Sequence, residues 1–274
     1  MIYDDTKCKL GEGPLWHPAR GELFWFDILK KRLHIKGRHW QFSRHVSAAG
    51  WLDDDRLLLA DSIGLHIFDL ATGTTDQICE IEADNSITRS NDGRADPWGG
   101  FWIGTMGINA EPDAGAIYRY FRGEVRQLFA KITISNAICF APDASCAYFC
   151  DTKTGKIMRQ KLAQSDGWPQ GDPEVWLDFG KTSWGADGAV VDGAGNLWNA
   201  QWGANRVACY GPDRNMTQTV AFPAAQTSCP AFGGTDLKTL FCTSAADGLI
   251  GEDDGKTFAT PVETIGQAEH QVIL

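Results

Sequence analysis

The sequence predicts an all-β protein, and more narrowly a six-bladed β-propeller that occupies residues 1–274 as a single domain. Two observations lead to this prediction. Aromatic strands separated by Gly/Asp turns recur along the chain, which contains 30 glycines and 11 tryptophans among 274 residues. The recurrence comes in six copies at a spacing of roughly 33 to 50 residues, which is the range of propeller blades.

The strands expected in each copy follow from the sequence between the turns. In chain order we expect strands at 14–16, 23–28 and 32–36; at 51–52, 56–61 and 65–70; at 101–106 and 116–121 after a turn at 91–100; at 137–141, 146–152 and 156–162; and in two further copies within 187–213 and 229–245. The residues that mark equivalent positions in the six copies are Trp25, Leu58, Trp102, Tyr148, Trp198 and Phe241.

Radial stacking explains why such short sheets are stable together. A sheet of three or four strands leaves both faces uncovered, whereas sheets stacked around an axis cover one another and keep only short edges. The ring must also be closed. We expect the segment before Leu10 to form an outer strand of the last blade and to pair with residues near 257–262.

Charge and composition exclude several classes of partner. The chain carries 25 Lys and Arg against 35 Asp and Glu, a net charge of −10, which disfavours nucleic acid and anionic membrane surfaces. No apolar run approaches the roughly 18 residues of a membrane span, and no export signal is recognisable. We therefore expect a cytoplasmic monomer or small homo-oligomer whose eight cysteines are reduced and mostly buried in the core.

Polar residues precede the innermost strand in four of the copies. They are Glu12, Asn91, Asn136 and Asp187. Any one of them alone is more simply a turn former. Because the innermost strands of a propeller surround one central channel, the four together predict an oxygen-rich site that suits a divalent cation: calcium, magnesium or manganese, with zinc or iron(II) tolerated.

Four stretches also carry a family resemblance. GEGPLW, RSNDGRADPWGGFWIGTM, ISNAICFAPD and DGAVVDGAGNLWNAQWG occur in this order, and the similarity extends from about Gly11 to about Ala245. They resemble the senescence-marker-protein/gluconolactonase/luciferin-regenerating family, the regucalcin-like sugar lactonases. The resemblance implies a six-bladed propeller with one divalent metal ion in its channel, and hydrolysis of a sugar lactone, an aldono- or aldarolactone, to the open-chain acid in carbohydrate catabolism.

The resemblance also implies roles for individual residues. Glu12, Asn136 and Asp187 match the metal ligands, and Asp187 also matches the general base. Arg89 and Asn91 match substrate-contacting residues.

Two positions depart from the family pattern. Ala186 stands where a proline often precedes the metal-binding aspartate, and Asn109 stands where some members have a substrate-contacting glutamate. Asn109 is therefore the expected substrate contact, with Glu111 as the alternative. Without a glutamate there, an acidic lactone whose carboxylate faces Arg89 becomes a more plausible substrate.

Other functions remain open at this point. A calcium-binding or scaffolding propeller without catalytic activity is the main alternative, because fold alone does not give function. A metal-dependent esterase acting on other esters is a minor one. No G-x-S-x-G nucleophile motif occurs, and the histidines, expected to be surface or strand residues, show no zinc-type spacing: His17, His34, His39, His45, His66 and His270.

Overall fold

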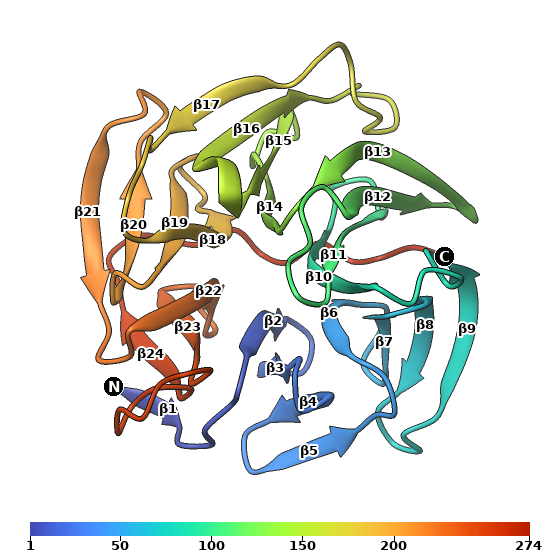
Figure 1. Ribbon diagram of the computed structural model, residues 1–274, viewed down its shortest axis with the longest axis horizontal. Coiled ribbons are helices and arrows are strands. Elements are labelled where there is room, and N and C mark those ends of the chain that lie inside the picture. The colour runs from blue at the N-terminus through green and yellow to red at the C-terminus, as the bar shows by residue number, and fades with distance from the viewer.

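Six antiparallel sheets of four strands each surround a central axis in the computed structural model, which describes residues 1–274 (Figure 1). The predicted six-bladed, all-β propeller is confirmed. In the first five blades the chain runs outward, from a first strand nearest the axis to an outermost fourth strand, before it enters the next blade; in the sixth blade the N-terminal strand is outermost (Figure 1).

The first three blades follow the order of the chain. Their strands are β2 (Gly11–His17), β3 (Glu22–Asp27), β4 (Arg32–Ile35) and β5 (Arg38–Gln41); β6 (Val46–Trp51), β7 (Arg56–Asp61), β8 (Gly64–Asp69) and β9 (Thr75–Glu80); and β10 (Thr88–Ala95), β11 (Phe101–Gly107), β12 (Gly115–Phe121) and β13 (Glu124–Ile132).

The last three blades contain the only helix, a single 3₁₀ turn η1. Their elements are β14 (Ser135–Phe140), β15 (Cys146–Asp151), η1 (Thr152–Thr154), β16 (Lys156–Lys161) and β17 (Glu174–Asp178); β18 (Gly185–Val191), β19 (Leu197–Trp202), β20 (Arg206–Tyr210) and β21 (Met216–Ala221); and β22 (Gln226–Gly233), β23 (Thr239–Ala245) and β24 (Thr257–Pro261) with β1 (Ile2–Asp4). No helix is long and apolar enough to cross a membrane.

The N-terminal strand closes the ring. β1 pairs antiparallel with β24, with Ile2 opposite Phe258, and therefore supplies the outermost strand of the sixth blade. The N-terminal ammonium group donates to the Ala259 carbonyl oxygen at 2.9 Å. The predicted closure is confirmed, and Figure 1 shows the N-terminus beside β24.

The core lies between neighbouring blades. Trp25, Trp102 and Trp198 are completely buried, and Trp102 packs edge-on against Phe140 of the next blade with ring centroids 5.5 Å apart. The six marker residues all lie in second strands. Trp102, Trp198 and Phe241 share one position in the ladder, whereas the other three are shifted along their strands, so the predicted equivalence holds only in part.

The predicted turn at 91–100 is wrong over its first half. Residues 91–95 belong to β10, which pairs with β11, and the turn begins only at Asp96, whose carboxylate accepts from the Trp98 and Gly100 amides at 2.9 Å. The Asn-Asp-Gly sequence forms a bulge inside the strand, because the polar side chains find partners in the interior. The outer strands β5, β9, β13, β17 and β21 also lay outside the three-strand pattern read from the sequence.

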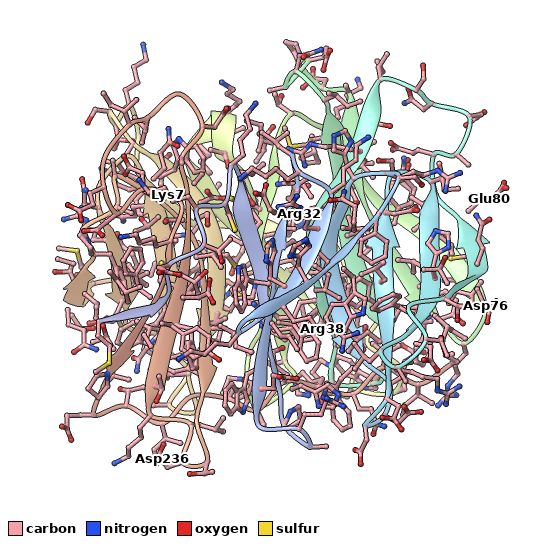
Figure 2. The ribbon with its side chains drawn as sticks, turned by 90° about the horizontal axis from the view of Figure 1, so that it is seen from below. Lys7, Arg32, Arg38, Asp76, Glu80 and Asp236 are labelled. Carbon is pink, nitrogen blue, oxygen red and sulfur yellow. The ribbon has the colours of Figure 1, made fainter.

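The two ends of the ring differ in what covers them. The inner strands begin at one end, here called the mouth, and the turns that join first to second strands lie at the other end, the base. Figure 2 shows the ring from the side, with Lys7 of a connector toward one end and Asp236 of the β22–β23 turn at the other.

The C-terminal segment 263–274 crosses the base (Figure 1). Its backbone bonds to the β18–β19 turn through Gly193, to the β22–β23 turn through Leu237, and to Trp51 and Gly99 on the far side. This strap was not foreseen from the sequence.

Candidate functional site at the mouth of the axial channel

The inner strands are all interrupted near their beginnings. In each of the six, the register with the second strand shifts, and the shifts lie between Glu12/Leu15, Val46/Ala48, Ser90/Gly93, Asn136/Cys139, Ala186/Ala189 and Thr227/Pro230. A bulge leaves side chains outside the regular ladder and bends the strand, which re-aims them. The polar residues singled out in the sequence lie at these irregularities.

Two backbone solutions place the candidate ligands. Asn91 and Asp187 lie inside their bulges, whereas Glu12 and Asn136 lie one residue earlier. The residue after each of the latter two is left-handed: Gly13 has φ 54° and Ala137 has φ 58°. A Cβ atom on Gly13 would lie 2.2 Å from the Ser47 carbonyl oxygen, so this position requires glycine.

Glu12 and Asp187 are buried carboxyl groups that act on each other. Their exposed fractions are 6% and 5%. Burial, and after it the Asp92 carboxylate, raises the pKa of Glu12 to about 8. Burial, followed by Glu12 and Asp92, holds the pKa of Asp187 well above its ordinary range.

Neither of the two carboxyl groups has a cationic partner in the protein. No Lys, Arg or His nitrogen lies within 4.0 Å of either of them. Buried charge without a partner is costly, so a pair of this kind marks a place where a cation is expected.

A chain of hydrogen bonds connects the amides and the arginine. Arg89 Nη1 donates to Asn91 Oδ1 at 2.8 Å, and Asn91 Nδ2 donates to Asn136 Oδ1 at 3.3 Å. Asn136 Nδ2 in turn donates to Thr152 Oγ1 at 2.9 Å, and Thr152 Oγ1 donates to the Ala186 carbonyl oxygen at 2.7 Å. The chain joins the third, fourth and fifth blades and fixes the orientation of both amides.

Asp92 was expected to be a turn residue, and the structure corrects this. Asp92 is buried inside the β10 bulge, where its carboxylate accepts from the Ile138 amide at 2.7 Å. It is close enough to raise the pKa values of both Glu12 and Asp187. The signal in the sequence was the pattern itself, because Asn-Asp-Gly at the start of an inner strand is equally suited to a bulge.

Asn109 lies away from this group, in the exposed loop between β11 and β12. Its side-chain Nδ2 donates to Glu111 Oε1 at 2.9 Å, and its backbone amide donates to Glu111 Oε2 at 3.0 Å. The loop is on the mouth side, since Gly107 is paired with Thr88 at the start of β10. Asn109 and Glu111 are thus hydrogen-bonded to each other, and neither is hydrogen-bonded to Arg89.

His45 is a residue of the site that the sequence did not single out. It precedes β6 directly and is half-buried. Burial, and after it the positive charges of Arg89 and Lys31, lowers its pKa. No spacing motif includes His45, so only the blade-to-blade alignment could have indicated it.

The donor chemistry of the mouth fits a hard divalent cation. Glu12 and Asp187 supply carboxylate oxygens and Asn136 an amide oxygen, which are the ligands that calcium, magnesium and manganese prefer. No group of three or more His, Cys, Asp or Glu side chains could hold a metal ion. The mouth therefore differs from zinc sites rich in histidine or cysteine, because an amide completes its donor set.

The fold and the axial donors define a propeller with a polar channel mouth, and comparison with known proteins gives the class. The chain belongs to the SMP-30/gluconolactonase/LRE-like family, whose match covers residues 10–246. The family predicted from the four sequence stretches is confirmed.

Individual relatives cover nearly all of the chain. A solved structure described as the calcium-binding protein regucalcin, from Agrobacterium tumefaciens, is 40% identical, with a TM-score of 0.97 over 100% of this chain and 97% of that one. L-arabinolactonase of Azospirillum brasilense is 36% identical over 90% of this chain and 85% of its own. The 6-deoxy-6-sulfogluconolactonase of Pseudomonas putida is 32% identical over 95% of this chain and 94% of its own.

Proposed function

We propose that this protein is a metal-dependent sugar lactonase, which hydrolyses an aldono- or aldarolactone to the open-chain acid. The observation that carries the proposal is the pair of buried carboxyl groups, Glu12 and Asp187, which meet at the channel mouth with amide donors and without a cationic partner. Relatives named as lactonases of arabinose and of a sulfonated glucose derivative support lactone hydrolysis as the reaction.

Glu12, Asn136 and Asp187 are the residues that would hold the metal ion. When bound, a divalent cation supplies Lewis acidity for the lactone carbonyl and neutralises the two carboxylates. The description of the Agrobacterium relative as calcium-binding supports calcium among the candidates, with zinc, magnesium, manganese and iron(II) as the others.

The remaining chemistry belongs to side chains of this protein. The carboxylate of Asp187 accepts a proton from the attacking water, a role that requires its ionised form. Arg89 and Asn91 donate hydrogen bonds to sugar hydroxyl groups, and their mutual bond of 2.8 Å keeps them in one orientation. The hydrogen bond from Asn199 Nδ2 to the Asp187 carbonyl oxygen at 2.9 Å holds the bulge that presents the base.

The rest of the proposal concerns the whole protein. We propose that residues 1–274 fold as one unit closed by β1, as a monomer or small homo-oligomer. Eight free cysteines, seven of them buried, suit the reducing cytoplasm as its location.

A pH-indicator screen tests the function. The protein is stripped with chelator, supplied with each divalent metal in turn, and mixed with neutral and acidic sugar lactones, with spontaneous hydrolysis subtracted. We expect acid release with at least one metal and lactone. Absence of acid release in every combination would favour the calcium-binding, non-catalytic alternative instead.

A further inference from the structure

The mouth has a second polar group besides the carboxyl pair, formed by Lys31, His45 and Arg89 and here called the basic wall. Val46 and Ser90 are the last paired residues before the bulges of β6 and β10. His45 and Arg89 therefore occupy the same position in neighbouring blades. The Ser47 hydroxyl donates to the Ser90 hydroxyl at 2.8 Å, so the two strands are in contact directly after this position.

Arg89 is buried with donors to spare. Its exposed fraction is 4%, its Nη1 is used by the Ser90 carbonyl oxygen and Asn91 Oδ1, and its Nε has no partner. A guanidinium group has five N–H donors in a planar fork that matches a carboxylate. A buried arginine with a free donor and no carboxylate within 4.0 Å is therefore suited to an anionic ligand.

Lys31 and His45 extend this positive side. Lys31, in the turn between β3 and β4, donates from Nζ at 3.0 Å to the carbonyl oxygen of Ser43, which lies two residues before His45. The charges that act on His45 are those of Arg89 and Lys31, and no carboxylate counters them. Arg44 also lies here, but Asp61 neutralises it at 3.9 Å.

No acidic side chain lies within ion-pair distance of the basic wall, although the Glu12 carboxylate is near enough to Arg89 to raise the pKa of the guanidinium, which burial lowers. None of its three members forms an ion pair. The carboxylate of the nearby loop, Glu111, is held by Asn109, and its Oε2 lies so close to Gly107 that a Cβ there would come within 2.2 Å of it.

We propose that Lys31, His45 and Arg89 bind the anionic substituent of the substrate, so that the preferred lactone is an acidic one whose second carboxylate faces the basic wall. This inference rests on the proposed lactonase function and names its substrate class. The donors of the three side chains support it: none of the three forms an ion pair, and Arg89 Nε has no partner, so a negative substituent of the lactone can bind to them. His45 can donate a ring N–H whether or not it is charged.

Kinetics on a matched pair of lactones test the proposal. Glucarolactone carries a carboxylate that gluconolactone lacks. With the metal that supports most activity, we expect kcat/KM to favour glucarolactone. His45→Gln and Lys31→Gln should each lower kcat/KM on glucarolactone by about tenfold, the size of a lost hydrogen bond to a charged group, and on gluconolactone by less than about twofold.

Controls separate charge recognition from packing. His39→Gln, on an exposed outer strand, and Lys161→Gln, on the outer part of the fourth blade, remove the same groups elsewhere and should change neither lactone. His45→Lys should keep the preference, and added salt should weaken it. Equal losses on both lactones, or an unchanged preference in His45→Gln, would overturn the proposal.

Binding measured without turnover distinguishes failure of the basic-wall proposal from failure of the proposed lactonase function. If the wild-type protein hydrolyses neither lactone with any metal, the lactonase assignment fails. The basic wall is then judged by calorimetry on metal-free protein, in which glucarate should bind about tenfold more tightly than glucitol, the uncharged polyol of the same length, and His45→Gln should shrink the difference. Equal binding of glucarate and glucitol would refute the basic wall in that case.

Discussion

The two ends of the axial channel both contain buried charged groups, which are paired with each other at the base and unpaired at the mouth. At the base, Arg94 forms a buried ion pair with Glu269 of the C-terminal strap, and its Nε donates to the Ile138 carbonyl oxygen at 3.3 Å. At the mouth, Glu12 and Asp187 are just as buried, yet no cation of the protein pairs with them. Asp92 lies between the two ends and is influenced by Arg94 and by Glu269.

The difference distinguishes a closure from a binding site. At the base, Arg94 and Glu269 of the same chain neutralise each other, so the strap stabilises the fold. A cavity of about 20 Å³ remains there, lined in part by Arg94, Cys139 and Glu269. Such a cavity holds roughly one water molecule. The charges at the mouth are left for a ligand, which is the arrangement expected where selection for function opposes stability.

The largest expected effect is at Asp187. Asp187→Asn should lower lactonase kcat by at least about 1,000-fold, because the proposed base and a metal ligand are lost together. The melting temperature without metal should stay the same or rise, since a buried carboxyl group facing Glu12 is removed.

Activity assays and thermal melts on the same sample measure both effects, with Asp236→Asn in the exposed β22–β23 turn as the control. Full activity of Asp187→Asn would remove this residue from the mechanism.

The second prediction concerns the base. Glu269→Gln should destabilise the protein by about 3 kcal/mol, because it leaves Arg94 buried without its partner. Activity below the melting temperature should change by less than about threefold, since this end of the channel has no substrate role.

Denaturant unfolding measures the loss. Glu263→Gln, an exposed glutamate of the same segment, is the matched control and should be neutral. Activity losses in Glu269→Gln as large as those in Asp187→Asn would contradict the division between the two ends.

A smaller effect is expected for metal affinity at Glu12. Glu12→Gln keeps the shape of the side chain but removes one of the two charges, and we expect the affinity for the divalent ion to fall by roughly 100-fold. Calorimetry or metal content after dialysis measures this change. An unchanged affinity would exclude Glu12 as a ligand.

The pH dependence of the metal-free protein follows from the same carboxyl group. In the folded protein the pKa of Glu12 is raised to about 8. Proton binding at Glu12 therefore stabilises the folded state fully at pH values below the ordinary pKa of a glutamate, and this stabilisation is lost as pH rises through about 8. Added metal should therefore raise the melting temperature more at pH 8 than at pH 6. Melts with chelator and with metal measure this, and Glu12→Gln should weaken the trend. A metal effect that shrinks with rising pH would have the wrong sign.

The smallest effect is expected at Asn109. Asn109→Ala removes two hydrogen bonds to Glu111 in an exposed loop, and we expect kcat on a neutral lactone to change by less than about twofold. Steady-state kinetics would show this. A loss of tenfold or more would mean that the loop closes over the substrate and that Asn109 contacts it.

The six-bladed architecture could be predicted from the sequence because each blade repeats the same local patterns. Strand alternation and Gly/Asp turns occur in every copy, and the N-terminal segment has the strand composition that the sixth blade needs. The outer strands were harder to recognise. Strands such as Met216–Ala221 are mostly exposed on both faces and carry no apolar alternation.

For the site, the sequence predicts which residues meet but not how they are aimed. Glu12 and Asp187 were expected before the inner strands, but both lie within them. Glu12 is the last paired residue before its bulge and Asp187 lies inside its own, a difference that only backbone geometry such as the left-handed Gly13 reveals. The roles of His45 and Glu269 depend on partners far away in the chain. Such contacts leave no local pattern.

Calorimetric titration of a divalent cation into three chelator-treated proteins tests the contrast most directly. The wild-type chain should bind one ion with the heat and affinity of a specific site, Glu269→Gln should bind it with similar affinity, and Asp187→Asn should bind it at least about 100-fold more weakly. Binding that survives in Asp187→Asn, or that is lost in Glu269→Gln while its fold remains intact, would contradict the assignment of the mouth as the binding end of the channel.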